Sequence, residues 1–144
     1  MPIITTTFSK DGTFTNLRQA WTADSLREHI AEARYAAESG GIYVGEQLVT
    51  TNRDEMPVWQ GMLLDAFVLR PGQQESYEYK PRGGTNTTLT PSQVARCYEC
   101  FAWYVGACFA TERQLVAMLN AGADPETVYS SITWPQRNFE WVAP

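Results

Sequence analysis

The hydrophobic pattern is strongest between Pro91 and Gly122, where it predicts one long helix on which the rest of the chain packs. Apolar side chains recur there in alternating steps of four and three residues, which places them on one helix face. These positions are Val94, Tyr98, Phe101, Val105, Cys108, Leu115 and Leu119. The polar Glu112 occupies the one position of the series between Cys108 and Leu115. The segment from Phe101 to Ala110 carries no charge, so we expect protein to surround it. Gly106 lies in mid-helix, where glycine costs about 1 kcal/mol relative to alanine, so we interpret it as a point of close approach by another element.

Weaker periodic patterns predict three shorter helices. The first is capped by Thr22 or Asp24, runs to about Glu38 and ends at Gly40-Gly41. The second follows a cluster of capping residues around Asn52 and stops at Pro71-Gly72, and the third is a short helix from Asp124 to about Ile132. The predicted buried positions are Leu26, Ile30, Ala33 and Ala37 in the first helix, and Met56, Trp59, Leu63 and Phe67 in the second.

Short β-branched or alternating segments between the helices predict three antiparallel hairpins. The first is an N-terminal arm, with strands within Ile3 to Phe8 and Thr13 to Leu17 joined by a turn at Lys10-Asp11-Gly12. The second pairs residues 42–44 with 48–50, and the third pairs 75–80 with 85–89. The fold class is therefore α+β, with a long central helix, two or three shorter helices and short antiparallel hairpins. We divide the chain into a hairpin arm (1–20), a single domain (21–135) and a C-terminal tail (136–144).

Composition narrows the functional classes. Aromatic content is 12%, with five Trp, and charged content is only 19%, which fits either a surface covered by partners or a large aromatic core. The net charge of -5 and the presence of only two Lys argue against nucleic-acid binding, which requires cations to neutralise phosphates. The uncharged stretch of the long helix is too short to span a bilayer, and the first residues lack the charged and apolar regions of a signal peptide. We therefore expect synthesis in a cytosol and no membrane span.

No group of residues predicts catalysis, a metal site or a cofactor. Cys97 and Cys100 form a CxxC motif, but a redox motif belongs at a helix N-terminus and a zinc site needs four ligands, so we interpret these thiols and Cys108 as buried. A thiol redox or zinc enzyme stays open as a minor hypothesis. His29 has no nucleophile or carboxylate in evident register with it, and we interpret it as a surface or half-buried side chain.

The remaining charged residues are interpreted as structural. Asp54-Glu55 is the acidic first turn of a helix, which the helix dipole favours. Arg53 is expected to pair with Glu55 or to hold backbone carbonyls of the turn. The predicted partner-binding residues instead lie on the arm, the third hairpin and the tail, where aromatic side chains are expected to be exposed or docked on a neighbour: Ile3, Phe8, Phe14, Tyr77, Tyr79, Phe139 and Trp141.

Three stretches carry a family resemblance: Val49-Thr50-Thr51-Asn52-Arg53, Thr88-Leu89-Thr90, and the closing helix pair up to Trp134. In order and spacing, the chain from about Leu26 to Trp134 resembles the C-terminal domain of unknown function found in many tailed-bacteriophage proteins, often encoded beside tail fibres and labelled tail or tail-fibre-assembly proteins. Members of that family commonly carry Asp where this chain has Asn52, a conservative departure. The resemblance implies a phage setting and an association with tail or fibre proteins, and it implies no reaction.

Two functional hypotheses follow. The first is a virion structural protein, a tail, baseplate or fibre adaptor that is made in the host cytoplasm and acts by protein–protein interaction. Such a subunit is a homo-oligomer or is present in several copies set by the symmetry of the particle. The alternative is a tail-fibre assembly chaperone that is not retained in the virion. A variant of the first hypothesis is recognition of a cell-surface glycan, with sugar rings stacked on Tyr77, Tyr79 or Trp59.

Overall fold

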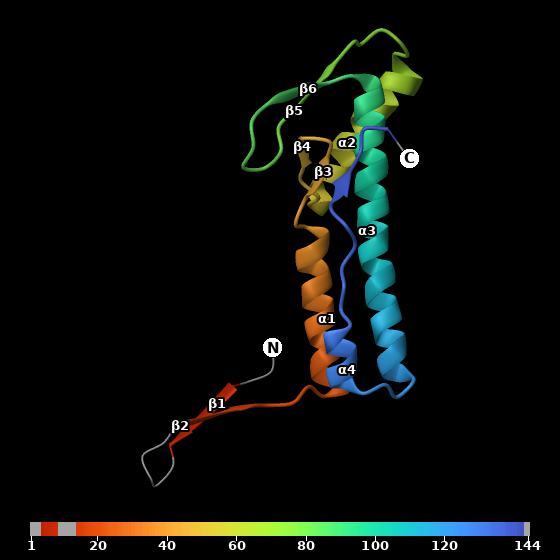
Figure 1. The fold of residues 1–144 in the computed structure, drawn as a ribbon. Coiled ribbons are helices and arrows are strands. Elements are labelled where there is room, and N and C mark those ends of the chain that lie inside the picture. Colours follow the sequence, from red (N-terminus) through yellow and green to blue (C-terminus); the bar gives the residue numbers. More distant parts are fainter. Residues whose placement is uncertain (1–3, 9–13, 143–144) are drawn as a thin grey trace.

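Two long helices that lie side by side and run in opposite directions form the body of the protein (Figure 1). The structure is a computed structural model that describes residues 4–8 and 14–142, with side chains from Gln19 to Val142. The helices are α1 (Ala23–Glu38), α2 (Met56–Leu64), α3 (Pro91–Asn120) and α4 (Pro125–Ser130), with a 3-10 turn at Arg53–Glu55 and a π-helical turn at Asp65–Leu69. The long helix predicted from the periodicity is α3.

Local capping signals define where the helices begin. Thr22 caps α1 and exchanges hydrogen bonds with Ser25 at 3.0 Å. Thr90 caps α3 in the same way with Gln93, and Pro91 occupies the first helical position, where no N–H is required. The helix boundaries predicted from the sequence are therefore confirmed to within a few residues.

The strands form one small mixed sheet and two separate hairpins. The mixed sheet has the order β4-β3-β7, with β3 (Ile42–Val44) antiparallel to β4 (Gln47–Val49) and parallel to β7 (Asn138–Phe139). The hairpins pair β1 (Ile4–Phe8) with β2 (Phe14–Arg18), and β5 (Tyr77–Tyr79) with β6 (Thr87–Leu89). The three antiparallel pairings are as predicted, whereas the parallel strand in the C-terminal tail was not. The arm hairpin lies apart from the helical body (Figure 1).

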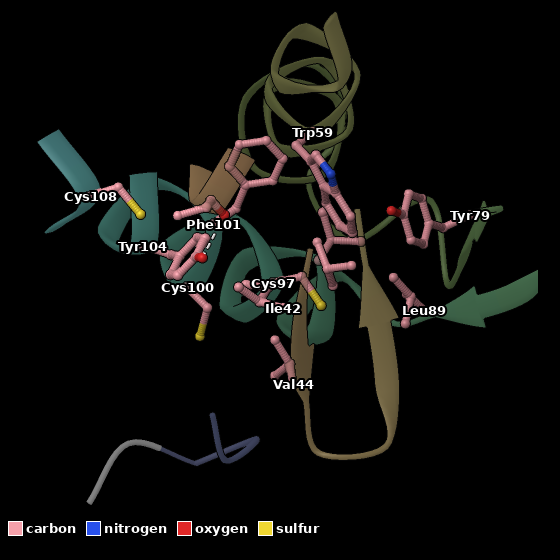
Figure 2. Close-up of a cluster of buried hydrophobic side chains, with 13 residues drawn as sticks. Ile42, Val44, Trp59, Tyr79, Leu89, Cys97, Cys100, Phe101, Tyr104 and Cys108 are labelled. Atoms are coloured by element: carbon pink, nitrogen blue, oxygen red, sulfur yellow. Dashed lines mark hydrogen bonds between the residues drawn. The ribbon is translucent and has the colours of Figure 1, made fainter. Parts of the chain in front are cut away.

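The larger core lies where α3 meets α2, the mixed sheet and the β5–β6 hairpin. Trp59, Phe101 and Tyr104 are fully buried there, and Figure 2 shows them gathered with the three cysteines and with Ile42 and Val44. The Tyr104 hydroxyl donates a 2.6 Å hydrogen bond to the carbonyl of Ala37, which joins α3 to the end of α1. A smaller cluster closes the other end of the helix pair: Trp21, Leu26, Ile30, Leu115, Leu119 and Val128.

Two burial predictions are wrong. The uncharged middle of α3 is not surrounded by protein, because Ala102, Trp103, Gly106 and Phe109 are exposed on the side opposite the core. Phe67 is 53% exposed, and Ala66 takes the buried position. The inward-facing side of this helix follows the seven-residue step from Trp59 to Ala66, which a regular helix brings to the same side, so Phe67 is turned away from the core. Among the described residues, no helix is long and apolar enough to cross a membrane.

Candidate functional site

A buried carboxylate at the end of α1 is the centre of the strongest polar cluster in the structure. Glu38 is 1% exposed, and its Oε1 accepts a 2.9 Å hydrogen bond from Nε of Arg53 and lies 2.8 Å from Nη2 of the same guanidinium. Nη1 of Arg34 lies 2.9 Å from that oxygen. Glu38 Oε2 is buried and has no hydrogen-bond partner among the described residues. A buried charge requires such pairing, because desolvation without it would be prohibitive.

The cluster continues from α1 to α3. Arg34 donates from Nε to Glu112 Oε2 at 2.9 Å, and its guanidinium carbon lies 4.4 Å from the ring centre of Phe109. Two arginines and two glutamates therefore alternate from the turn before α2, through α1, to α3. This explains why Glu112 stands at a position of the buried α3 stripe that the periodicity reserves for an apolar side chain.

The turn that precedes α2 is held by side chains of the Thr50-Thr51-Asn52-Arg53 motif. Thr51 is buried, and its hydroxyl accepts a 2.9 Å hydrogen bond from the backbone N–H of Gly41. Thr50 donates at 2.6 Å to Glu55, and the hydroxyl of Thr50 also lies 3.2 Å from that of Tyr79. Arg53 pairs with Glu38 and not with Glu55, so the first of the two interactions predicted for Arg53 is wrong. The motif thus ties the end of α1, the start of α2 and the β5–β6 hairpin together.

A cavity of about 290 Å³ opens beside this turn. It is lined by Tyr35, Glu38, Ser39, Asn52, Arg53, Asp54 and Arg82. Arg82 and Asp54 form an ion pair at the exposed side of the cavity. The lining holds two cationic and two anionic side chains that pair with one another, so the cavity has little net charge with which to attract an ionic ligand. Its geometry fits a structural junction better than a catalytic site.

An exposed apolar surface lies at the end of α2 and in the π turn. Its four members are between 49% and 65% exposed and fall within two helical turns: Leu64, Phe67, Val68 and Leu69. We call them the α2 patch. Arg70 and Asp65 border it and form an ion pair at 2.7 Å. Apolar patches with a polar rim on a soluble domain are typical of protein interaction surfaces, and a π turn is common where a helix carries function. The sequence did not predict this patch, because helical periodicity assigned Phe67 to the core.

The predicted partner-binding residues fall into three groups. Ile3 lies outside the described residues, and the side chains of Phe8 and Phe14 are also outside the described part, although both residues belong to the arm hairpin. Phe139 and Trp141 are partly buried against the larger core, so the tail docks on its own chain. The prediction that Tyr79 is exposed is wrong: it is 6% exposed, and its ring centre lies 4.6 Å from that of Trp59.

Tyr77 is half-buried and takes part in a small polar group beside the α2 patch. Its hydroxyl donates a 2.6 Å hydrogen bond to Asp65, which also accepts from Nε and Nη2 of Arg70 at 2.7 and 2.8 Å. The hydrogen bonds from Arg70, and then from Tyr77, hold the pKa of Asp65 below its ordinary value. Trp59 and Tyr79 are buried, so neither ring is accessible for the sugar stacking considered from the sequence.

The three cysteine thiols are buried and unpaired, as predicted. Burial raises the pKa of Cys97 to about 12 and raises the pKa values of Cys100 and Cys108. A thiol with a raised pKa is a poor nucleophile, because the thiolate is the reactive form. Within the described residues, no three His, Cys, Asp or Glu side chains are grouped as metal ligands would be.

Comparison with protein families gives one match. The model of the family described as "Domain of unknown function (DUF4376)" matches residues 22–133, which covers α1 to α4 and leaves out the N-terminal arm and the C-terminal tail. No curated protein and no solved structure matches the chain. The matched region includes the Glu38 cluster, the turn before α2 and the α2 patch.

Proposed function

The chain belongs to the family of the Domain of unknown function (DUF4376), and we propose that this member is a non-enzymatic structural subunit of a bacteriophage tail, baseplate or fibre assembly. The phage setting rests on the sequence resemblance described above. The mode of action rests on one observation of the structure, the α2 patch. Four large apolar side chains remain half-exposed or more although the same chain builds a complete core.

The position of the α2 patch supports docking of another protein. It lies at the end of the molecule that also carries the β5–β6 hairpin (Figure 1), so a partner could contact both elements. Asp65 joins the patch to the hairpin through Tyr77, which holds the two elements in a fixed relation before binding. A preorganised surface loses less conformational entropy when a partner docks, which favours affinity.

The first test is mass spectrometry of purified particles of the phage that encodes the chain. The proposal predicts a fixed copy number in mature virions. Recovery of the chain only in a soluble complex with a fibre protein from infected cells would favour the assembly chaperone instead. Absence from virions and from fibre complexes would refute both functions.

A second test addresses the α2 patch. Val68→Asp places a charge in the middle of the patch, where Val68 is 65% exposed. Val142→Asp makes the same change at a more exposed valine in the tail, which is 79% exposed. We expect the first variant to reduce incorporation or complex formation by about tenfold or more, as loss of a central interface contact does. The control variant should behave as the wild type. Equal behaviour of the two variants would exclude the α2 patch as the contact surface.

A further inference from the structure

The outer face of α3 is a second apolar surface, distinct from the α2 patch. Cys97, Tyr104 and Cys108 point into the core, and Gly106 lies on the opposite side of the helix. Trp103 and Phe109 lie three residues before and after Gly106, and they are 53% and 38% exposed. One side of each ring is already in contact within the chain: Trp103 meets Phe139 edge-on at 5.6 Å, and Arg34 lies over Phe109 at 4.4 Å. In Figure 1 no other helix or strand lies beside the middle and lower parts of α3 on the side that faces away from α1, whereas the π turn after α2 lies beside its upper end.

Small residues surround Gly106 on this face. A Cβ atom placed on Gly106 would meet nothing within 4 Å among the described residues, so the glycine is not required by a neighbour within the chain. Ala102 and Ala110 lie one turn to either side. The close approach that the mid-helix glycine predicts therefore has no partner in the described part of the chain.

Charges on the same face are placed symmetrically. Glu99 and Arg113 lie seven residues before and after Gly106, which is two helical turns and nearly the same line along the helix. The Glu99 side chain is 67% exposed and lies 3.4 Å from Nη1 of Arg96, whose own side chain is 15% exposed. Arg113 is exposed, with no ion pair in the described part of the chain. Glu99 thus places an exposed carboxylate on one half of the face, and Arg113 places an exposed guanidinium on the other half.

We propose that this face binds a second copy of the same chain, with the two α3 helices antiparallel about a two-fold axis at Gly106. In that arrangement a residue that precedes Gly106 by a given number of positions lies opposite the residue of the other copy that follows Gly106 by the same number. Glu99 of each copy meets Arg113 of the other, and Ala102 meets Ala110. A two-fold axis makes both ion pairs at once, as an isologous interface requires.

The same arrangement uses the aromatic side chains. Trp103 and its copy lie along one edge of the helix pair, and Phe109 and its copy lie along the other edge. The small residues between them allow the helix backbones to approach closely, which increases dispersion contacts and excludes water. From Ala95 to Ala117 the contact runs about 33 Å along the helix.

Charge placement selects the antiparallel second copy over other occupants. A parallel two-fold pair would set Glu99 against Glu99 and Arg113 against Arg113, which is repulsive. The two-fold rotation about Gly106 brings Glu99 opposite Arg113, so the face is complementary to a second copy of itself. An unrelated helix would need its own charges at the matching positions. The inference concerns a surface separate from the α2 patch, so it goes beyond the proposed function and does not require a phage setting.

Charge reversal tests the arrangement by sedimentation equilibrium of the full chain. The wild type should have twice the 16.2 kDa mass of one chain. Glu99→Arg and Arg113→Glu should each raise the dimer dissociation constant by roughly tenfold or more, because each leaves two like-charged contacts. An equimolar mixture of the two variants, and the double reversal in one chain, should both restore the dimer. Circular dichroism checks that the exposed substitutions leave the fold intact.

Disulfide trapping separates the antiparallel pair from the parallel one. Oxidised mixtures of Ala102→Cys and Ala110→Cys chains should yield the mixed 102–110 disulfide far more than either homodimer, and the buried native thiols leave the background low. A monomeric wild type at all concentrations, single reversals that dimerise as well as the wild type, or trapping of 102–102 and 110–110 pairs would each overturn the proposal.

Discussion

Arg53 and Glu38 are joined through two nitrogens of one guanidinium, at 2.9 and 2.8 Å from the same carboxylate oxygen. The pair connects the turn before α2 to the end of α1, fifteen residues earlier in the chain. The two partners differ in environment, because the Glu38 side chain is 1% exposed and the Arg53 side chain is 63% exposed. Their removal should therefore have unequal consequences.

Glu38→Ala should be strongly destabilising. It leaves the guanidinium of Arg34, which is only 14% exposed, without one of its two carboxylates, and it opens a gap at the end of α1. We expect a loss of about 3 kcal/mol in the free energy of unfolding, typical of breaking a buried ion pair. Arg53→Ala should cost about 1 kcal/mol or less, since the exposed arginine is rehydrated when free and Arg34 still neutralises Glu38. Urea unfolding measures both values, and equal losses would show that Glu38 does not act as the shared partner.

Stability should decline on the acid side through Asp65. Hydrogen bonds from Arg70 and Tyr77 lower the pKa of Asp65 in the folded chain. A lowered folded-state pKa means that the carboxylate stabilises the fold above the ordinary pKa, about 4, and that this contribution is lost as the pH falls through the lower folded value. The urea concentration at the unfolding midpoint of the wild type should therefore decrease as the pH is lowered below about 4.

Two variants isolate this contribution. Asp65→Asn should flatten the acid-side decline, and Tyr77→Phe should flatten it partly, because Arg70 still holds the carboxylate in that variant. Unfolding midpoints of the three proteins across the acid range provide the comparison. Parallel curves for the wild type and Asp65→Asn would assign the decline to other carboxylates.

The native thiols should be almost inert to a thiol-specific reagent at pH 8. A pKa of about 12 leaves Cys97 with roughly a thousandfold less thiolate than an ordinary cysteine with pKa about 8.5. Burial also blocks the approach of the reagent to all three sulfur atoms. With a reagent that releases a coloured product on reaction with thiols, the colour should appear slowly in the folded protein and completely on denaturation. Rapid modification of Cys97 or Cys100 in the native state would reopen the thiol redox or zinc hypothesis.

Much of the fold follows from local signals. The caps at Thr22 and Thr90, the Pro91 start and the periodicity of α3 are set by residues within a few positions of one another, so sequence reasoning located these helices. The Tyr77-Glu78-Tyr79 alternation predicted a strand correctly. The alternation does not indicate whether these tyrosines face the core or the solvent. Tyr79 is buried because its ring packs on Trp59, which lies on α2.

The features that sequence reasoning missed depend on distant partners. β7 has only two residues and exists because it lies parallel to β3, almost a hundred positions earlier in the chain. Arg53 pairs across the end of α1, which nothing near Asn52 signals. Phe67 follows Leu63 by four residues and fits the predicted stripe, but the side that meets the core is centred on Trp59 and Ala66, so Phe67 is exposed and the α2 patch was not predicted.

Gly45 offers a sharp test of how the tail docks on the mixed sheet. It has φ +58 in the turn between β3 and β4, and a Cβ atom there would collide with the indole ring of Trp141. Gly72 has a similar φ of +73 but open space within 4 Å of its Cβ position among the described residues. The two glycines therefore share the backbone requirement and differ in the steric one.

Gly72→Ala should lower the free energy of unfolding by about 1 kcal/mol, the cost of a left-handed backbone in a non-glycine residue. Gly45→Ala should cost about 3 kcal/mol, because overpacking against Trp141 adds to that strain. On a Trp141→Ala background the extra cost of Gly45→Ala should disappear, since the two side chains would no longer meet. Urea unfolding of the four variants completes the cycle, and limited proteolysis should show a more accessible tail in Gly45→Ala but not in Gly72→Ala. Equal costs for the two glycines would mean that Trp141 moves freely and that the tail is not fixed at this turn.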